Sequence, residues 1–387
     1  MRFRRCHSMV VMPFEEATLS LDSLASGGAC IEFHGSIRVY AAHIDTICTL
    51  EARACMVLLG CSAEAWQPLP ADGQALADVM ALVESGLLLL EGDVSSPEAC
   101  NDQRIRAAHW WPLSAIHHRH ARWEGVDSAR EMERRKMVTA RDLVRQLGVP
   151  PTEAPSGGSV AIALPRLDND GAELQARVTC RNFDQDRALP LHVLAAMLQD
   201  VVMAQSVVES EPGIRFLKKN VPSAGGLHPI EAYIVARDVE GLPPAVYHYR
   251  AVAHELTKVS DGTEEIVSLS HRLCAGQDWF AGAHVLVVLA CRFDRNFWKY
   301  RRHAKAYRAV ILDAGHISQA FYAAATRRGL GAFVTAAINE VDAEKALGLD
   351  PMQEGVIAVC GFGWRAPSMT MAELDPAGHV WNLGQTS

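Results

Sequence analysis

The alternation of apolar and polar residues predicts a small mixed region of helices and strands near the N-terminus. Residues 30–43 alternate between apolar and polar side chains, which is typical of a strand or a hairpin. In residues 74–90 the apolar positions recur at helical spacing until Gly86, where we expect the helix to end and a short apolar strand to follow. The pattern predicts an α+β unit of about 110 residues, and a winged-helix-like arrangement is compatible with it. The apolar face of the predicted helix consists of Leu76, Val79, Leu82, Val83 and Leu87.

The second half of the chain predicts a sheet with helices against it. Residues 190–209 begin with a proline, which the first turn of a helix tolerates, and carry an apolar stripe, so we expect one helix there. Apolar runs rich in β-branched and aromatic residues, bounded by Gly or Pro, are the expected strands. These runs are residues 231–237, 245–249, 283–291 and 355–363.

Residues 304–328 predict a long helix that is apolar nearly all round. A helix without a polar side is expected to be buried on all sides. In a domain of about 220 residues, this predicts a central helix between the sheet and another layer, for which a second subunit is a candidate. The apolar positions are Ala306, Ala309, Val310, Ile311, Leu312, Ala314, Ile317, Ala320, Phe321 and Ala324.

Two shifts in composition divide the chain. The first lies in the charged, His-rich stretch after Trp110 and Trp111, and the second is the segment rich in Pro, Gly and Ser at residues 149–159. The second shift is the better linker, because its residues neither continue a helix nor suit a central strand. We expect a small N-terminal domain, a charged helical linker and a larger C-terminal domain, with these boundaries: 1–115, 116–160 and 161–387.

Composition and charge exclude several classes of function. The chain of 387 residues carries 37 Lys and Arg against 45 Asp and Glu, and this net charge of −8 gives no bulk basic field for nucleic acids. No run approaches the ~20 apolar residues that span a bilayer, and Pro13 interrupts the N-terminal apolar stretch before a signal-peptide core forms. The 10 cysteines include no CxxC pair and are typical of free thiols in a reducing compartment. These features predict a cytoplasmic protein that binds neither nucleic acid nor membrane.

The first candidate site is a cluster of Arg177, Thr179 and Arg181. Residues four apart share a side in a helix or a strand, so two guanidinium groups and a hydroxyl can converge on one point. Arginine presents forked donors that match phosphate oxygens, and two arginines offset most of the charge of a dianion. The alternative is a solvated basic edge, because short arginine patterns also recur by chance.

A glycine-containing loop at residues 222–229 is the second candidate. Gly225 and Gly226 allow the backbone to approach a planar ligand closely, and Ser223 adds a hydroxyl. The loop could therefore cradle a flat ring. It matches neither the P-loop nor the dinucleotide-binding fingerprint, and a tight connection between two elements remains the alternative.

Lys299 and Tyr300 are the third candidate, because they place an ammonium and a phenol at the start of the predicted long helix. A partly desolvated lysine there could act as a base. The alternative is a solvated basic helix start, since further cations surround them. The histidines at 109, 117, 118 and 120 lack a matched carboxylate or thiolate, so we predict no metal site.

Taken in order, these segments resemble the FMN-dependent nitroreductase superfamily. More narrowly, they are similar to the SagB-type peptide-maturation dehydrogenases, which oxidise azoline rings to thiazoles and oxazoles in ribosomally made peptides. The resemblance covers about residues 165–365 and departs at Thr335, where a glycine-containing stretch is expected, while the first 150 residues match only loosely. It rests on Arg177 to Phe183, PSAGGLHPIEAY (222–233), GLPPAVYHYRAVAHEL (241–256), KYRRHAKAYRAVILDAGH (299–316) and RRGLGAF (327–333).

The resemblance implies an α+β fold that dimerises through long central helices and binds FMN in the dimer interface. It implies that Arg177, Thr179 and Arg181 hold the phosphate, and that Lys299 and Tyr300 match the catalytic Lys–Tyr pair of the family. The expected residues along the isoalloxazine are Ser223, Ala224 and Gly225, and further cofactor-binding candidates are Arg308, Gly329 and Gly331.

The function implied is dehydrogenation in the maturation of a ribosomally synthesised peptide. The expected substrate is a modified precursor peptide, with a cyclodehydratase as a candidate partner. Two alternatives stay open because a fold does not determine a substrate. They are a general NAD(P)H-dependent nitro or quinone reductase, and a flavin-free scaffold in a peptide-modifying complex.

Overall fold

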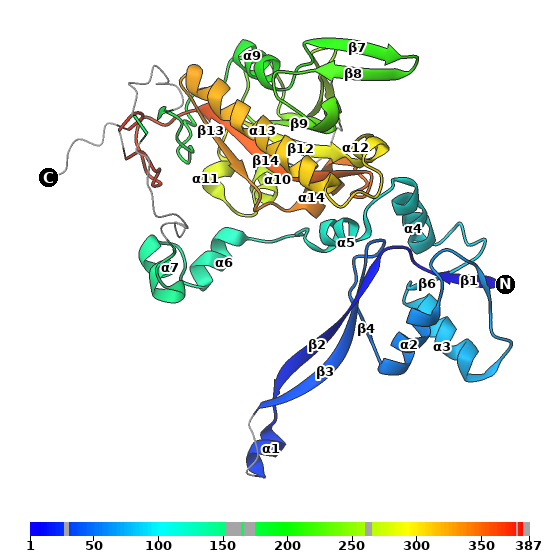
Figure 1. Ribbon diagram of the computed structural model, residues 1–387. Coiled ribbons are helices and arrows are strands. Elements are labelled where there is room, and N and C mark those ends of the chain that lie inside the picture. Colours follow the sequence, from blue (N-terminus) through cyan, green and yellow to red (C-terminus); the bar gives the residue numbers. More distant parts are fainter. Residues whose placement is uncertain (27–30, 152–163, 166–174, 260–264, 377, 382–387) are drawn as a thin grey trace. The chain divides into compact units, whose positions relative to one another are not determined.

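The computed structural model describes residues 1–26, 31–151, 164–165, 175–259, 265–376 and 378–381 (Figure 1). The chain forms two compact units that do not follow the sequence order. The first unit contains Met1–Arg122, Arg292–Val310 and Asp350–Gly355. The second unit contains Trp123–Cys291, Ile311–Leu349 and Val356–Ser387.

The first unit contains a small antiparallel sheet covered by helices. Strand β1 (Arg2–Arg5) lies between β5 (Gln67–Pro68) and β6 (Leu88–Leu90). Helices α2 (Ala52–Gly60) and α3 (Gly73–Glu84) accompany it, and their buried side chains include Leu58 and Leu82. The predicted helix, glycine break and strand at residues 74–90 are therefore present, and Gly86 adopts φ +75° at the break.

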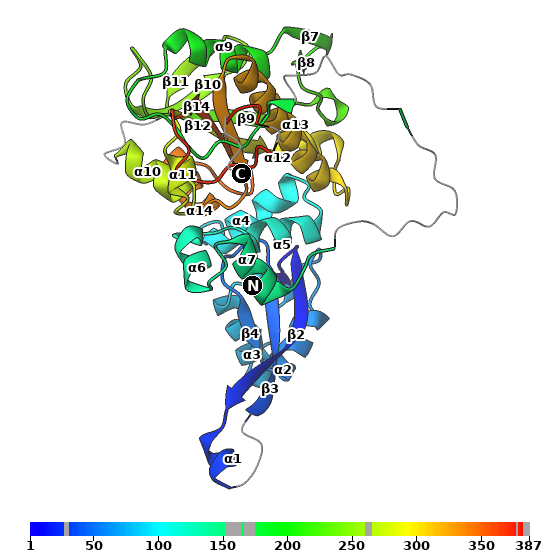
Figure 2. The ribbon, with the colours of Figure 1, turned by 90° about the vertical axis from the view of Figure 1, so that its left-hand side faces the viewer.

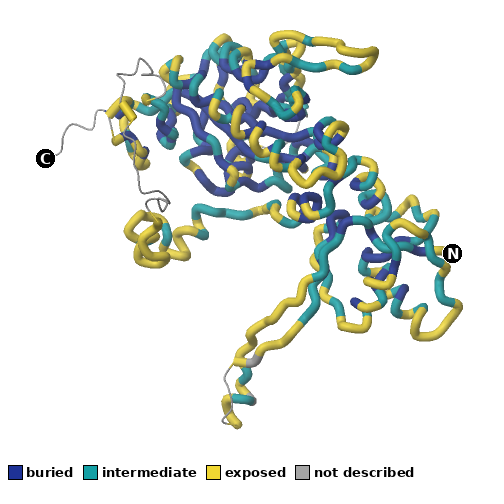
Figure 3. Tube along the Cα trace, viewed as in Figure 1, coloured by how far each residue is buried: buried dark blue, intermediate teal, exposed yellow. Residues whose placement is uncertain are grey.

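A long hairpin extends from the same unit. Strands β2 (Met9–Leu19) and β3 (Ile31–Ala41) pair antiparallel along their whole length, from Met9 with Ala41 to Leu19 with Ile31. The strand expected within residues 30–43 is therefore β3. Short strand β4 (Cys48–Leu50) pairs with the inner part of β3, and the outer half of β2 is exposed (Figure 3). Helix α1 (Leu21–Ala25) lies at the tip (Figure 2).

Further helices of the first unit come from separate parts of the chain. Helices α4 (Pro97–Ala107) and α5 (Pro112–His120) belong to the N-terminal region, whereas α12 (Phe293–Lys299) comes from far along the chain. Trp110 lies between α4 and α5 and is 1% exposed, and its ring centroid lies 4.4 Å from that of Phe293. This aromatic contact joins the N-terminal region to α12 in residues 292–310.

The second unit is built on a six-stranded sheet of order β11-β10-β9-β12-β14-β13. The four strands expected from the sequence are all present, while β11 and β13 were not anticipated. Central strand β12 is buried along nearly its whole length, as its continuous apolar pattern requires. The strands are β9 (Ile230–Ala236), β10 (Ala245–Arg250), β11 (Glu255–Lys258), β12 (Val285–Arg292), β13 (Leu330–Thr335) and β14 (Glu354–Trp364).

Helix α13 (Ala306–Arg327) is the long helix predicted from the sequence (Figure 1). Its Phe321 packs on Phe362 of β14 with ring centroids 5.9 Å apart. The expectation that it is buried on all sides is wrong for the single chain. Ile311 is 46% exposed and Leu312 is 57% exposed, so the described residues of this chain leave one side of the helix uncovered. The apolar pattern correctly predicted the helix but could not show which layer would cover each side.

The single helix expected over residues 190–209 is also wrong. Helix α9 (Leu191–Val201) ends earlier, and the following residues form the hairpin β7 (Ser206–Glu211) and β8 (Ile214–Lys218). Gly213, at φ +81°, makes the turn between the strands. The β-branched and charged residues of β7 suit an exposed hairpin better than a helix.

The remaining helices of the second unit are short. Asp127 caps the first of them by accepting a hydrogen bond from Arg130 N at 2.8 Å, and Thr139 forms a capping box with Asp142. The division into residues 1–115, 116–160 and 161–387 stays a prediction, and its stretch 152–163 lies outside the described residues. In the described part of the chain, no helix is long and apolar enough to cross a membrane. The short helices of the second unit are α6 (Ser128–Arg134), α7 (Ala140–Leu147), α10 (Ile266–Leu273), α11 (Asp278–Ala281) and α14 (Glu340–Leu347).

Candidate functional site

Two of the three predicted phosphate-binding residues meet at Tyr322 of helix α13. Thr179 forms a bridge with Ala332 of β13, and its Oγ1 lies 3.0 Å from the hydroxyl of Tyr322. The guanidinium carbon of Arg177 lies 5.1 Å from the centroid of the same ring. Tyr322 therefore holds Arg177 and Thr179 as neighbours, although no pattern in the sequence singled it out.

Arg181 makes different contacts from Arg177. Its guanidinium carbon lies 5.8 Å from the centroid of Phe280, and its Nη1 donates to Ala372 O at 3.4 Å. It also lines a cavity of about 520 Å³ together with Trp279 and Glu373. The structure thus does not bring Arg181 to Tyr322, and the two arginines share no described partner.

The buried carboxylate of Glu373 fixes the backbone at Arg181. Its Oε1 accepts from Arg181 N at 2.6 Å and from Asn182 Nδ2 at 2.8 Å, and its Oε2 accepts from Arg365 at 2.7 Å and Trp381 at 2.7 Å. Burial raises the pKa of Glu373, but these hydrogen bonds and the Arg365 charge outweigh it and lower that pKa overall. No spacing in the sequence indicates this anchor, because Arg181 and Asn182 lie almost 200 residues from Glu373.

The loop that carries Ser223, Ala224 and Gly225 is held by Asp313. Ser223 Oγ donates to Asp313 Oδ2, and the backbone N–H of Ala224 donates to Asp313 Oδ1 at 3.0 Å. Ser223 Oγ also accepts from His228 N at 2.9 Å. Gly225 adopts φ +63° within this turn, a conformation that glycine takes without strain. The three residues predicted to line a flat ring therefore lie in one short turn with a defined geometry.

Asp313 was missed by the sequence analysis. It is 3% exposed within α13, and burial raises the pKa of its carboxyl despite the two hydrogen bonds that favour the charged form. Its only sequence signal is a carboxylate inside an otherwise apolar run, and such a residue needs a partner when it is buried.

The two glycines of the predicted cofactor set have different surroundings. Gly329 follows α13 with φ +66° and has open space where a Cβ would be, as expected for a helix stop. At Gly331 a Cβ would lie 2.4 Å from Cys180 Sγ, so glycine permits β13 to approach the extended segment of Thr179 and Cys180 closely. This packing explains Gly331 without a ligand, and its role in cofactor binding stays a prediction.

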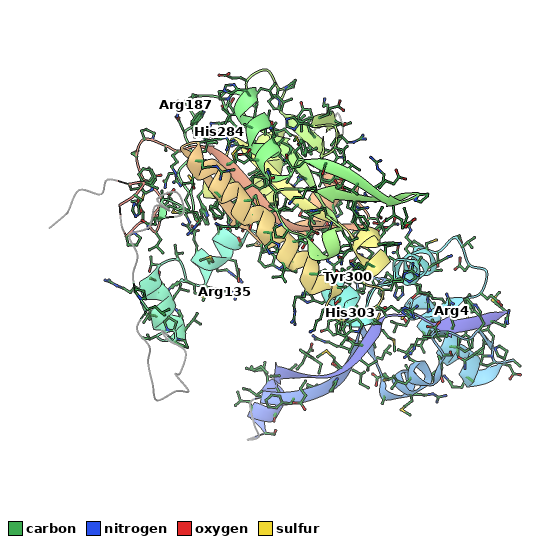
Figure 4. The ribbon with its side chains drawn as sticks, turned by 45° about the horizontal axis from the view of Figure 1, so that its top comes forward. Arg4, Arg135, Arg187, His284, Tyr300 and His303 are labelled. Carbon is green, nitrogen blue, oxygen red and sulfur yellow. The ribbon has the colours of Figure 1, made fainter. Side chains whose placement is uncertain are left out.

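Lys299, Tyr300 and Arg308 lie in the first unit. Lys299 is the last residue of α12, and α13 begins only at Ala306, so the pair does not open the long helix as expected. Lys299 is exposed, and its Nζ lies 5.6 Å from the centroid of the half-buried Tyr300 ring. Arg308 is exposed on α13. Figure 4 labels Tyr300 and His303 at the turn that joins the two helices.

Two other expectations concern Thr335 and the histidines. Thr335 Oγ1 accepts hydrogen bonds from Gln277 Nε2 at 3.3 Å and from Ala337 N at 3.2 Å. At the position where a glycine-containing stretch was expected, the threonine hydroxyl therefore bonds the backbone that follows β13. Of the histidines, His118 bonds to Pro351 O and His120 to Ala41 O. Within the described ranges, no group of three or more His, Cys, Asp or Glu side chains is arranged to hold a metal ion.

Residues 174–364 match the model of the nitroreductase family. The chain belongs to the nitroreductase family. It is 30% identical over 177 residues to the trifolitoxin-processing protein TfxB of Rhizobium leguminosarum bv. trifolii, which covers 44% of this chain and 46% of TfxB. It is 32% identical over 137 residues to the putative nitroreductase MJ1384 of Methanocaldococcus jannaschii, covering 35% of this chain and 64% of that protein. The chain thus matches less than two thirds of the length of either relative.

A solved structure shares the fold. The Escherichia coli microcin synthetase McbBCD complex with truncated pro-MccB17 bound contains a chain that is 21% identical to this one. The TM-score is 0.50, and the match covers 67% of this chain and 92% of that chain. The resemblance found in the sequence is confirmed: this is a nitroreductase-family protein of the SagB type. Its fold is α+β, with an N-terminal α+β region followed by the nitroreductase domain.

Asp313 provides the first test of the site. Asp313→Ala leaves Ser223 and the Ala224 N–H without their acceptor, and we expect a loss of about 1 to 3 kcal/mol in the free energy of unfolding. Asp313→Asn keeps one carbonyl oxygen and should lose less. Urea denaturation of the two variants measures the difference, and wild-type stability in Asp313→Ala would show that the carboxylate does not hold the loop.

Proposed function

We propose that this protein is an FMN-dependent dehydrogenase that oxidises azoline rings to azoles in a modified precursor peptide. The observation that carries the proposal is the sequence relationship to TfxB, a protein named for processing the peptide trifolitoxin, over a region that matches the nitroreductase family. A complex that contains a bound precursor peptide shares the fold, and this supports a peptide substrate. We further propose a cyclodehydratase as the partner that supplies the azoline.

The guanidinium groups of Arg177 and Arg181 have the chemistry that the phosphate of FMN requires, although among the described residues of the single chain they do not meet at one partner. In the described part of the chain, neither Arg177 nor Arg181 has a carboxylate partner for its guanidinium, and Thr179 adds a hydroxyl beside Arg177. Uncompensated guanidinium groups of this kind are suited to a dianion. We propose that Arg177, Thr179 and Arg181 bind the phosphate and that the turn Ser223–Gly225 lies along the ring. Arg308, Gly329 and Gly331 remain proposed cofactor contacts.

The chemistry requires a base. Converting an azoline to an azole removes a proton from one ring carbon and a hydride from the other. FMN, when bound, supplies the hydride acceptor. We propose that Lys299 or Tyr300 takes the proton, while the other residue orients or stabilises it. The two side chains are neighbours, because the ammonium of Lys299 lies 5.6 Å from the centroid of the Tyr300 ring.

We propose that the protein is a homodimer that covers α13. Ile311 and Leu312 are 46% and 57% exposed on the helix, and a self-complementary contact would remove both from water.

A general NAD(P)H-dependent nitro or quinone reductase is the second candidate function, favoured by the likeness to MJ1384. A flavin-free scaffold is the third candidate.

The cofactor assignment predicts weak flavin retention when the arginines are removed. Charge-assisted hydrogen bonds contribute roughly 1.5 to 3 kcal/mol each, so Arg177→Ala with Arg181→Ala should weaken FMN binding by about a hundredfold or more. Titration of the apoprotein with FMN, followed by fluorescence, measures this. The control is Arg187→Ala, because Arg187 pairs with Asp184 at 3.1 Å and stacks on Trp364. Equal FMN affinity in the double variant and the control would exclude the phosphate site.

The proposed base predicts a loss of rate without loss of flavin. Lys299→Ala and Tyr300→Phe should each slow azole formation by about 10² to 10⁴. The matched control is Lys305→Ala, an exposed lysine of the following turn. Turnover of an azoline peptide by both variants within about threefold of wild type contradicts the catalytic role. If the protein turns over nitroaromatics or quinones but no azoline peptide, the general reductase is favoured. If the purified wild-type protein is colourless, the flavin-free scaffold is favoured.

The dimer predicts sensitivity to a charge on α13. Leu312→Glu should convert the dimer to a monomer, because the buried carboxylate would lack a partner. Light scattering measures the mass, and Val267→Glu is the control, since Val267 is 53% exposed on α10. A monomeric wild-type protein that retains flavin would refute the proposed assembly.

A further inference from the structure

The segment that carries Lys299 and Tyr300 folds with the N-terminal region. Residues 292–310 belong to the first compact unit together with residues 1–122. Helix α12 directs Phe293 and Phe297 into the interior, where they are 0% and 1% exposed, and leaves Lys299 exposed. The contacts of these two phenylalanines therefore determine where α12, and Lys299 at its end, lie within the unit.

Trp110 is the centre of those contacts. Its ring centroid lies 4.4 Å from that of Phe293, 4.7 Å from that of Phe297 and 6.0 Å from that of Tyr307. Its Nε1 donates to Met352 O at 2.9 Å, so the indole is fixed in orientation as well as in depth. One side chain of the N-terminal region thus contacts residues on both sides of the Lys299–Tyr300 turn.

His118 secures the far end of the turn. It is 3% exposed, with Nδ1 at 3.0 Å from the hydroxyl of Tyr307 and Nε2 at 2.9 Å from Pro351 O. Burial lowers the pKa of His118 to about 3, so the ring is neutral and carries one donor and one acceptor. Because the Pro351 carbonyl can only accept, Nε2 donates to it and Nδ1 accepts from Tyr307.

The middle of the turn is tied by an unusual backbone contact. Arg302 N donates to His109 O at 2.8 Å, and both residues have positive φ values, +52° and +58°. A non-glycine residue in this conformation persists only where its surroundings enforce it. Asn296, 1% exposed, adds a bond from Nδ2 to Ala306 O at 3.1 Å across the same turn.

We infer that Trp110, with His109 and His118, positions the turn that carries Lys299 and Tyr300. These three are positioning residues, since none of them is proposed to touch the substrate. The inference rests on the proposed function for its catalytic consequence but not for the anchoring itself. It assigns to the N-terminal region a part in the reaction that is separate from any binding of peptide or partner.

Limited proteolysis tests the anchoring without cofactor or substrate. Arg301, Arg302 and Lys305 are exposed in the turn and are trypsin sites. Trp110→Ala should raise the rate of cleavage after these residues about tenfold or more, because cleavage follows the population of the open turn. Trp110→Phe retains a packed ring and should raise it less than about threefold. Trp66→Ala is the control, because Trp66 lies in the same region and stacks on Arg4.

Steady-state kinetics tests the positioning. Trp110→Ala should lower kcat for azoline oxidation about ten- to a hundredfold, with KM for the peptide and bound flavin unchanged, because small misplacements of reacting groups cost this much. Trp110→Phe should recover kcat to within about threefold of wild type. A general loss of structure would instead lower flavin content and fail to separate Trp110→Ala from Trp66→Ala, and this would overturn the inference.

The outcomes separate the inference from the proposed function. If Lys299→Ala keeps the wild-type rate, the catalytic proposal fails, while the cleavage rates still decide the anchoring. If Lys299→Ala is inactive but Trp110→Ala keeps the wild-type kcat, the positioning role is wrong. Should Trp110→Ala fail to fold, Tyr307→Phe removes only the hydroxyl that bonds His118. A cleavage rate about threefold above wild type is then expected, and an unchanged rate overturns the anchoring.

Discussion

The arrangement of the candidate cofactor site depends on two polar side chains of helix α13. Asp313 bonds the turn of Ser223 and Ala224, and Tyr322 contacts both Thr179 and Arg177. The two residues are nine positions apart, so at about 100° per residue they leave the helix on opposite sides. One helix thus fixes two segments that are more than 40 residues apart in the sequence, while Phe321 packs the same helix onto the sheet.

This arrangement has an energetic logic. A buried carboxylate is costly unless hydrogen bonds replace water, and Asp313 accepts one on each oxygen from the loop. The loop in turn contains glycines at φ +63° and +67°, which would fluctuate without an anchor. Each element compensates for the weakness of the other, and the result is a turn of defined geometry with its backbone at the surface of the domain.

The sequence predicted the apolar framework well and the polar connections poorly. The strands at 231–237 and 283–291 and the helix at 304–328 are runs whose composition alone determines their structure. Asp313 and Glu373 escaped prediction because Ala224 lies 89 residues from Asp313 and Asn182 lies 191 residues from Glu373, and no local pattern encodes such contacts. The end of α9 was missed because the β-branched residues after Val201 read equally well as helix or strand until the turn at Gly213 is recognised. Among the site candidates, Ser223, Ala224 and Gly225 lie in one turn as expected. Arg181 lies apart from Arg177 although both come from one segment, and Tyr322, which joins Arg177 to Thr179, was not anticipated.

The composition of the first unit also changes how the N-terminal region should be regarded. A fragment that began at residue 161 would retain Phe293 and Phe297 but lose Trp110 and His118. Two phenylalanine side chains that are at most 1% exposed would then face water, at a cost of roughly 1.5 to 3 kcal/mol each. The hydroxyl of Tyr307 and the carbonyl of Pro351 would lose their common partner at the same time. The turn with Lys299 and Tyr300 would therefore lose the packing that defines it, even though every residue of the nitroreductase match would still be present. In this chain the N-terminal region is a structural part of the segment that carries the proposed base.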